Sequence, residues 1–133
     1  MIDTTALILR YYEAFNLGDM DAMLGCLSDD VVHGINQSGR VTGREPFRRF
    51  MDRMNRCYRE RLTEVVVFSS TDATRAAAEY VVNGMYLATD AGLPPARGQT
   101  YVLPGGAFFT VKEGKISRVT NYYNLQDWLR QVQ

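Results

Sequence analysis

The sequence predicts an α+β fold in which helices come first and a curved antiparallel sheet follows. Apolar residues recur at helical spacing through the first part of the chain. From residue 65 onward, β-branched and aromatic runs alternate with clusters of glycine, proline and aspartate. Because long strands with a built-in bend curl, the sheet and three N-terminal helices should surround a concave interior suited to a small-molecule ligand.

Length and charge narrow the classes of protein to consider. A chain of 133 residues fits a single domain spanning 1–133. Its 15 basic residues balance its 15 acidic residues, so no overall field would draw it to nucleic acid or an anionic membrane. No apolar run approaches the roughly 20 residues that a membrane-spanning helix needs. We therefore expect a cytoplasmic protein with neither a nucleic-acid partner nor a membrane partner.

Three helices are expected before the sheet. The first begins near Asp3, which can cap it, and ends at Gly18. Asp19 can cap a short second helix. The third starts near Gly43, and its apolar spacing continues as far as Leu62. This regular spacing indicates a helix with one face on a core.

The strands follow with shorter turns between them. They are expected at residues 31–36, 40–41, 65–68, 75–88, 98–111 and 116–123. The second-to-last of these contains Pro104-Gly105-Gly106, so a bulge or a sharp bend is expected there. Asn124 should cap a short C-terminal helix.

Several common functional motifs are missing. Cys26 and Cys57 have no metal-ligand neighbours in the sequence, so two reduced thiols are expected rather than a disulfide or a metal site. Seven arginines lie between residues 44 and 61, but acidic residues interleave with them, as in Glu45 and Arg49. A solvated face therefore fits better than a nucleic-acid surface. One histidine and two separated cysteines do not make an ordinary zinc site, so no metal is expected. No glycine-rich phosphate loop is present in the sequence, so no cofactor is expected either.

Four stretches, at residues 11–19, 27–31, 43–47 and 114–123, carry a likeness to a known superfamily. The chain resembles the nuclear transport factor 2-like proteins, and within them the SnoaL-like and ketosteroid isomerase-related group. This resemblance covers essentially the whole chain and implies one SnoaL-like domain. It also implies a cone-shaped, cystatin-like fold, with a curved antiparallel sheet on three N-terminal helices. The fold hosts isomerases, cyclases, dehydratases, epoxide hydrolases and non-catalytic binding domains.

The ketosteroid isomerases in this superfamily use a carboxylate base, a tyrosine and a protonated acid to form an enolate. The resemblance places Tyr11 at the catalytic tyrosine, although Tyr11 could equally be a core residue at helical spacing. The base position falls on Ile35, or on Gly34 if a loop is one residue shorter. The protonated acid falls near Ala107. None of these three residues exchanges a proton, so the family mechanism is incomplete here.

Other residues could supply acid–base chemistry. His33 is the single histidine, and its ordinary pKa suits proton transfer near neutrality, although a single histidine is more often structural than a base. Glu79 alternates with Ala77 and Val81 on one strand, where apolar neighbours would raise its pKa. It could instead pair with an arginine or face a partner subunit. The candidate catalytic residues are therefore Tyr11, His33 and Glu79.

Candidate ligand-binding residues come from strand alternation and from the resemblance. Asn121 and Tyr123 share a face of the last strand, which lines the cavity in relatives. Asn83 falls on a carboxylate position of the epoxide hydrolases of this fold. The full set is Asn36, Asn83, Gln99, Tyr101, Asn121 and Tyr123. Such residues in an apolar hollow suit a ring-bearing ligand with a few oxygens.

The sequence therefore leaves two candidate functions. The leading one is a SnoaL-like pocket protein that performs cofactor-independent isomerisation, cyclisation or dehydration of a hydrophobic oxygenated small molecule. The alternative is a non-catalytic binding or dimerisation module that has lost the catalytic acids. A homodimer through the outer sheet face is also expected, because Val and aromatic residues occupy both faces of the long strands and relatives often pair that way.

Overall fold

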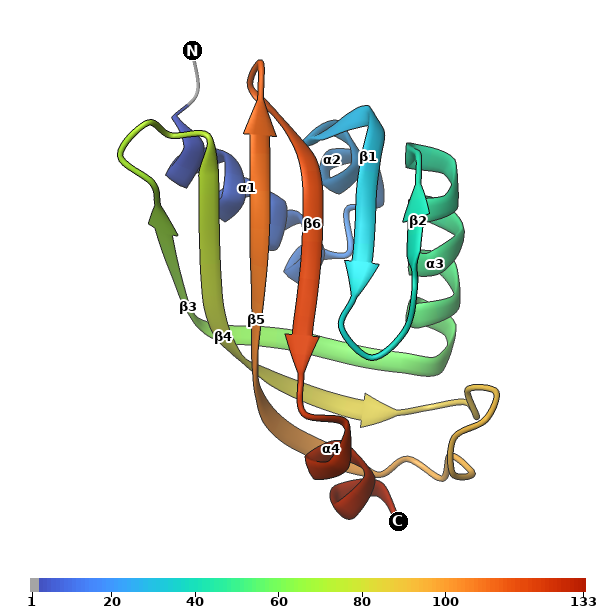
Figure 1. Cartoon of the computed structure of the whole chain (residues 1–133). Helices are drawn as coiled ribbons and strands as arrows, with labels where there is room; N and C mark the ends of the chain where they lie inside the picture. The colour runs from blue at the N-terminus through green and yellow to red at the C-terminus, as the bar shows by residue number, and fades with distance from the viewer. Residues whose placement is uncertain (1–2) are drawn as a thin grey trace.

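The computed structural model describes residues 3–133. The elements are α1 (Thr4–Leu17), α2 (Met20–Gly25), β1 (Leu27–Ile35), β2 (Arg40–Thr42), α3 (Arg44–Cys57), β3 (Tyr58–Ser69), β4 (Arg75–Tyr86), β5 (Thr100–Lys112), β6 (Lys115–Tyr123) and α4 (Leu125–Val132). The strands form one sheet in the order β2-β1-β6-β5-β4-β3 (Figure 1). The predicted α+β class, with three helices ahead of the main sheet, is confirmed.

The sheet is mixed, so the prediction of a purely antiparallel sheet is wrong. From β3 to β6 the four strands alternate in direction, but β1 runs parallel to β6. Strand periodicity predicts which side chains share a face and says nothing about strand direction. Since β1 and β6 are far apart in the chain, no short turn forces them to run in opposite directions.

The helix caps are those that the sequence predicts. The Asp3 side chain accepts a hydrogen bond from the Ala6 amide at 2.9 Å, and Asp19 and Asn124 cap α2 and α4 in the same way. Gly18 ends α1 with a φ of 72°, a left-handed conformation that glycine adopts without strain. These local signals therefore fix the helix ends.

The third helix is shorter than predicted, and this error matters for the site. It ends at Cys57 instead of continuing to Leu62, and β3 begins at Tyr58. From that residue onward β3 pairs with β4, so the backbone bonds of the sheet override the helical spacing. The side chain of Asn16 in α1 also bonds the backbone of Leu62. Its Oδ1 accepts from the Leu62 N–H at 2.8 Å, and its Nδ2 donates to the Leu62 carbonyl at 2.9 Å. Residues 58–62 therefore lie in the sheet.

A bulge or a sharp bend is predicted at Pro104, and of these the bulge is absent, because β5 stays in register with β4 through that residue. Pro104 is tolerated since the pairing of β5 with β6 begins only at Gly105. The long strands have their bulges elsewhere, between Thr63 and Val66 in β3 and at Ser117 in β6, which lies between the pairs Thr110–Arg118 and Val111–Ile116.

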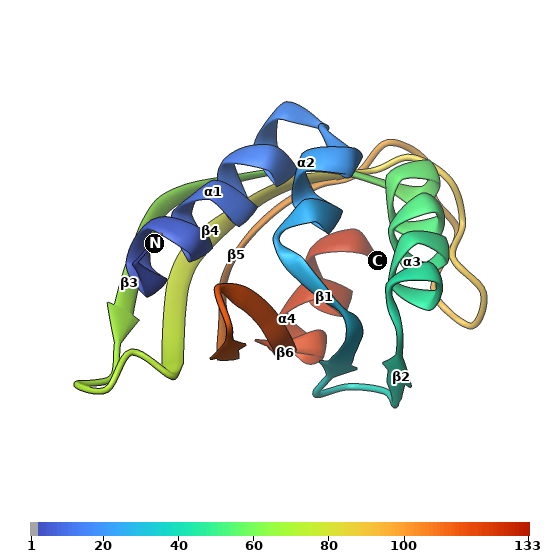
Figure 2. The ribbon, with the colours of Figure 1, turned by 90° about the horizontal axis from the view of Figure 1, so that it is seen from above.

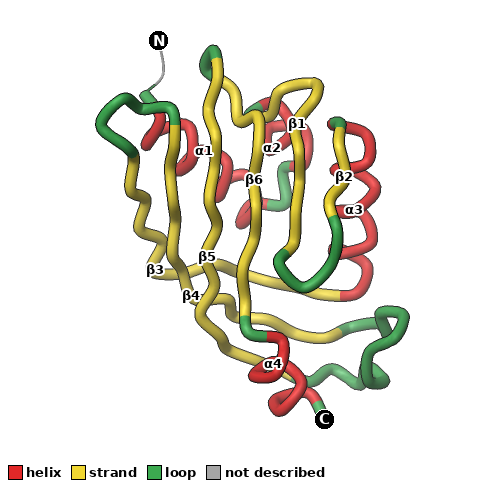
Figure 3. Tube along the Cα trace, viewed as in Figure 1, coloured by secondary structure: helices red, strands yellow, loops and turns green. Residues whose placement is uncertain are grey.

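The sheet curls around the helices (Figure 2). α1, α2 and α3 lie on its concave side, and the ends of β3, β4 and β5 bend beneath them towards α4 (Figure 1). The loop at residues 87–99, which joins β4 to β5, extends beside this bend (Figure 3). Both cysteines are buried and free. None of the described helices is long and apolar enough to cross a membrane.

Candidate functional site

A cavity of about 750 Å³ lies between the concave face of the sheet and the helices. Elements from both halves of the chain contribute to its wall, including α1, α3, the strands β3 to β6, and α4. Its apolar lining includes Phe15, Phe47, Met51, Leu62, Leu103 and Trp128. The polar groups described next are therefore set in a largely apolar hollow.

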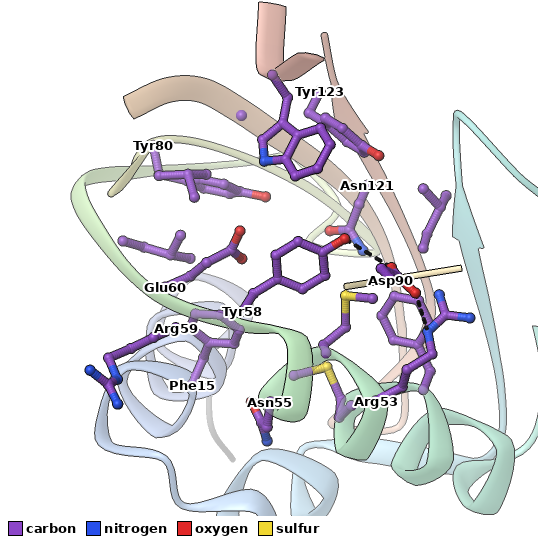
Figure 4. A pocket seen from close by; sticks show the side chains of 18 of the residues that line it. Phe15, Arg53, Asn55, Tyr58, Arg59, Glu60, Tyr80, Asp90, Asn121 and Tyr123 are labelled. Carbon is purple, nitrogen blue, oxygen red and sulfur yellow. Dashed lines mark hydrogen bonds and ion pairs between the residues drawn. The ribbon is translucent and has the colours of Figure 1, made fainter. Parts of the chain in front are cut away.

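Glu60 of β3 points into this cavity (Figure 4). Its Oε2 atom accepts a hydrogen bond of 2.6 Å from the Tyr101 hydroxyl. Burial raises the pKa of Glu60, and the bond from Tyr101 opposes that rise. Within the described residues no lysine, arginine or histidine forms an ion pair with Glu60. Figure 4 shows the Arg59 guanidinium turned away from it.

Further tyrosines surround this carboxylate. Burial raises the pKa of Tyr80 to about 12, and the charge of Glu60 contributes to the rise. Burial also raises the pKa of Tyr123, with contributions from the charges of Glu60 and Asp90. The phenols therefore stay protonated at neutral pH and can donate hydrogen bonds to oxygens in the cavity.

A second carboxylate, Asp90, lies on the loop at residues 87–99. Its Oδ2 accepts a 2.8 Å hydrogen bond from the Tyr58 hydroxyl, and its Oδ1 lies 3.6 Å from Arg53 Nε (Figure 4). The Asp90 N–H donates to the Tyr86 hydroxyl at 3.0 Å, which in turn donates to the Pro94 carbonyl at 2.7 Å. Asp90 is only 7% exposed. These bonds join the loop to α3 and to the sheet.

His33 lies in the same cavity and is paired with Asn121. The imidazole Nε2 is 3.1 Å from the amide Nδ2 of Asn121, and the ring packs at 4.7 Å from both Phe47 and Phe50. Burial lowers the pKa of His33 to about 4. The ring is therefore neutral near pH 7 and is a poor proton acceptor.

Tyr11 also lines the cavity, from α1. It is 3% exposed, and its ring packs edge-on against Phe109 at 5.9 Å and Tyr12 at 5.1 Å. Burial, with a smaller contribution from Tyr80, raises the pKa of Tyr11 well above the ordinary value of tyrosine. The structure thus brings together five of the predicted site residues, of which four are Tyr11, His33, Asn121 and Tyr101. Tyr123 joins them at the wall.

Glu79 and Asn83 do not lie in the cavity, so their predicted place at its wall is wrong. Glu79 is exposed, and the Asn83 amide bonds the Thr63 hydroxyl at 2.9 Å outside the hollow. The alternation along β4 is as predicted, but the other set of residues faces inward: Ala76, Ala78, Tyr80, Val82 and Tyr86. That set contains no charged residue, which is the signal that identifies the inner face.

Two other predicted ligand residues also lie away from the cavity lining. Asn36 is exposed just after β1. The Gln99 side chain donates to the carbonyls of Pro95 and Val132, at 2.9 Å and 2.8 Å, and accepts from the Arg97 amide. Gln99 therefore ties the loop at residues 87–99 to the C-terminal helix.

The two residues that the resemblance offers for the base position differ in their surroundings. Ile35 lines the cavity, whereas a side chain at Gly34 would meet Arg40 Cγ at 3.1 Å and Thr120 Cγ2 at 3.6 Å. Of the two residues, Ile35 is therefore the one that faces the cavity. Ala107, at the position of the missing protonated acid, is buried and apolar.

Glu60 is not among the residues that the sequence predicts for the site, because the apolar spacing predicts a helix through residues 58–62. As a strand, the same residues alternate so that Tyr58, Glu60 and Leu62 share the inner face. An acid between an aromatic and an aliphatic residue at spacing two is the signal that could have found it. Asp90 was missed because it lies in a loop with no periodic pattern.

Residues 8–119 match the SnoaL-like domain family. The chain belongs to the SnoaL-like family. This membership confirms the superfamily that the sequence resembles. Among residues 3–133 of this SnoaL-like domain, no group of three His, Cys, Asp or Glu side chains is arranged to hold a metal ion.

Solved structures resemble this SnoaL-like domain along its whole length. A candidate polyketide cyclase from Pseudomonas putida KT2440 is 59% identical, with 100% of each chain covered and a TM-score of 0.99. Another from Xanthomonas campestris pv. campestris is 58% identical, with 98% of this chain and 96% of that chain covered and a TM-score of 0.94. A protein with a ketosteroid isomerase-like fold from Catenulispora acidiphila is 16% identical, with 95% and 91% covered and a TM-score of 0.77. That last likeness shows the fold alone. No curated protein matches the chain.

Proposed function

We propose that this SnoaL-like protein is a cofactor-independent acid–base enzyme, an isomerase or cyclase of a hydrophobic oxygenated small molecule, with Glu60 as its base. The observation that carries the proposal is the Glu60 carboxylate, which faces an apolar cavity without a cationic partner among the described residues. Burial raises its pKa towards the range in which a carboxylate removes protons effectively. Glu60 thus takes over the role of the carboxylate missing at Ile35.

In the proposed mechanism, the oxygen of Glu60 that is not bonded to Tyr101 accepts a proton from a carbon next to a substrate carbonyl. The Tyr11 hydroxyl donates a hydrogen bond to the enolate oxygen that develops. Returning the proton to a different carbon completes an isomerisation. Attack of the enolate carbon on a second carbonyl of the same molecule, with protonation of the new alkoxide, completes a ring closure.

The names of two relatives support this assignment. Both structures above 55% identity are described as candidate polyketide cyclases. Closing a ring between an enolate carbon and a carbonyl begins with the same proton abstraction that an isomerase performs. The proposal therefore needs one base and one oxyanion donor for either outcome, and Glu60 and Tyr11 fill these roles.

The test is deuterium exchange next to the carbonyl of ketone probes in D2O, followed by NMR. We expect the protein to accelerate exchange in at least one of 2-tetralone, acetophenone and 5-androstene-3,17-dione. Glu60→Gln should abolish the acceleration, and Tyr11→Phe should reduce it. Glu79→Gln is the matched control, because Glu79 is exposed outside the cavity. Probes that bind but exchange only at the uncatalysed rate would favour the non-catalytic alternative.

We also propose that a second copy covers the outer face of the sheet. Five large hydrophobic side chains on that face are between 41% and 56% exposed: Val66, Phe68, Val102, Phe108 and Tyr122. Phe108 and Tyr122 already pack edge-to-face at 5.4 Å. An apolar patch of this kind favours pairing over exposure to water. Sedimentation should give the mass of a dimer at micromolar concentration and that of one chain for Phe108→Glu, whereas a wild-type monomer would reject the proposal.

A further inference from the structure

Three residues stand side by side across the concave face of the sheet. Glu60 of β3 is paired with Gly84 of β4, and Gly84 is paired with Tyr101 of β5. Neighbouring strands are about 4.8 Å apart, so roughly 10 Å of sheet separates the backbones of Glu60 and Tyr101. The Tyr101 hydroxyl nevertheless donates to Glu60 at 2.6 Å. Its ring therefore lies across β4, over Gly84.

This arrangement leaves no room for a side chain at residue 84. A Cβ on Gly84 would collide with the Tyr101 ring and would lie 2.5 Å from its hydroxyl oxygen. The backbone gives no separate reason for glycine, because Gly84 is not among the glycines with a positive φ. Its missing side chain is thus explained by the ring above it.

We infer that Gly84 is a positioning residue, which holds the Tyr101 hydroxyl on Glu60 by letting the ring cross β4. The hydroxyl donates to the ionised carboxylate and favours that form, while burial disfavours it. Gly84 would therefore act on the proposed base without touching the substrate. The catalytic part of this inference rests on the proposed function, whereas the link between Gly84, Tyr101 and Glu60 does not.

The chain provides a matched control in a second glycine beneath a tyrosine. Tyr80 of β4 is paired with Gly105 of β5, and a Cβ on Gly105 would lie 2.7 Å from Tyr80 Cε1. Gly105→Ala therefore displaces a tyrosine ring from the same face of the same two strands. The bond between Tyr101 and Glu60 should remain, because the atoms nearest to that Cβ all belong to Tyr80.

The first experiment measures stability in urea without any substrate. Gly84→Ala should lower the free energy of unfolding in the wild-type background, because the ring must move. In a Tyr101→Ala background the same change should have little effect, since the colliding ring is gone. If Gly84→Ala destabilises both backgrounds equally, the inference is wrong. This comparison also holds if Gly84→Ala alone fails to fold, because the double variant should then recover folding.

The second experiment follows the ionisation of Glu60 by carboxyl ¹³C NMR. Gly84→Ala and Tyr101→Phe should both move the Glu60 midpoint to higher pH, and Gly105→Ala should move it less. A hydrogen bond to a charged group changes its ionisation equilibrium about tenfold. At a pH below the midpoint, the rate of ketone α-proton exchange should therefore fall roughly tenfold in Gly84→Ala and Tyr101→Phe. An unchanged midpoint in Gly84→Ala would overturn the inference. The titration remains readable if no probe exchanges, so failure of the proposed function would be seen separately.

Discussion

Two carboxylates in the cavity have the same kind of partner but different surroundings. Glu60 and Asp90 each accept a hydrogen bond from a tyrosine hydroxyl, at 2.6 Å and 2.8 Å. Asp90 also has the Arg53 guanidinium at 3.6 Å, whereas Glu60 has no cation among the described residues. A paired buried charge holds structure together, while an unpaired one holds a proton more tightly than usual. This difference is why we propose Glu60 as the base and a structural role for Asp90.

The largest expected effect is on activity. Glu60→Gln should lower the rate of ketone α-proton exchange by about 10²–10⁴-fold, because it removes the base and leaves the side-chain shape nearly unchanged. Asp90→Asn should change the rate far less, since the amide can still accept the bond from Tyr58. Equal losses from both substitutions would remove the distinction between the two carboxylates.

The next effect concerns His33, whose proton affinity is shifted in the opposite sense to that of Glu60. Its pKa is about 4 in the folded protein and about 6.5 in the unfolded chain, so the unfolded chain binds the proton first as pH falls. Stability should therefore be lost between pH 6.5 and 4, with about 3 kcal/mol lost by pH 4 from this group alone. His33→Gln should lose correspondingly less in urea unfolding at pH 7 and pH 4. An identical pH dependence in both proteins would contradict this.

A smaller effect, on stability, is expected from replacing Asp90. Asp90→Ala should lower the free energy of unfolding by about 2 kcal/mol, because it leaves the half-buried Tyr58 hydroxyl without its acceptor and Arg53 without its carboxylate. The loop at residues 87–99 should also exchange its amide protons faster. Hydrogen exchange and urea unfolding measure the two changes. An unaltered loop would show that Asp90 does not hold it.

The smallest expected effect is on the stability of Glu60→Gln. Replacing Glu60 should stabilise the protein at pH 7, whereas replacing Asp90 should destabilise it. Burial raises the pKa of Glu60 in the folded state, so the folded protein binds its proton more tightly than the unfolded chain does. That contribution is present at low pH and is lost as pH rises through the folded pKa. Glu60→Gln should therefore be more stable than wild type at pH 7, and the difference should shrink as the pH approaches 4.5. Destabilisation at pH 7 would indicate that Glu60 has a compensating partner.

The sequence predicts local features of this fold better than the partners of each strand. Asp3, Gly18, Asp19 and Asn124 act over a few residues, and each ends or begins a helix as expected. The end of α3 could not be found this way, because Leu62 continues the helical spacing while its backbone pairs with β4. Long-range pairing decided the outcome there.

The candidate site shows the same contrast between local patterns, which the sequence reveals, and long-range packing, which it does not. Tyr11, His33, Tyr101, Asn121 and Tyr123 were expected at the cavity and line it. Strand alternation grouped Glu79 and Asn83 correctly, but it could not tell which face would be covered by the helices. Glu60 could not be placed at the cavity from the sequence, because the helical spacing continues past Cys57, where α3 ends. Sequence patterns thus identify the residues that share a face, while packing determines which face becomes the site.

The assignment of Glu60 as the base is tested most directly by titrating its carboxyl with ¹³C NMR, with the resonance assigned from the spectrum of Glu60→Gln. We expect a midpoint above the ordinary value of 4.5 for a glutamate, because desolvation in the cavity disfavours the charged carboxylate, which has no cationic partner among the described residues. A midpoint at or below 4.5 would show that Glu60 is stabilised in its charged form, which would contradict its assignment as the base.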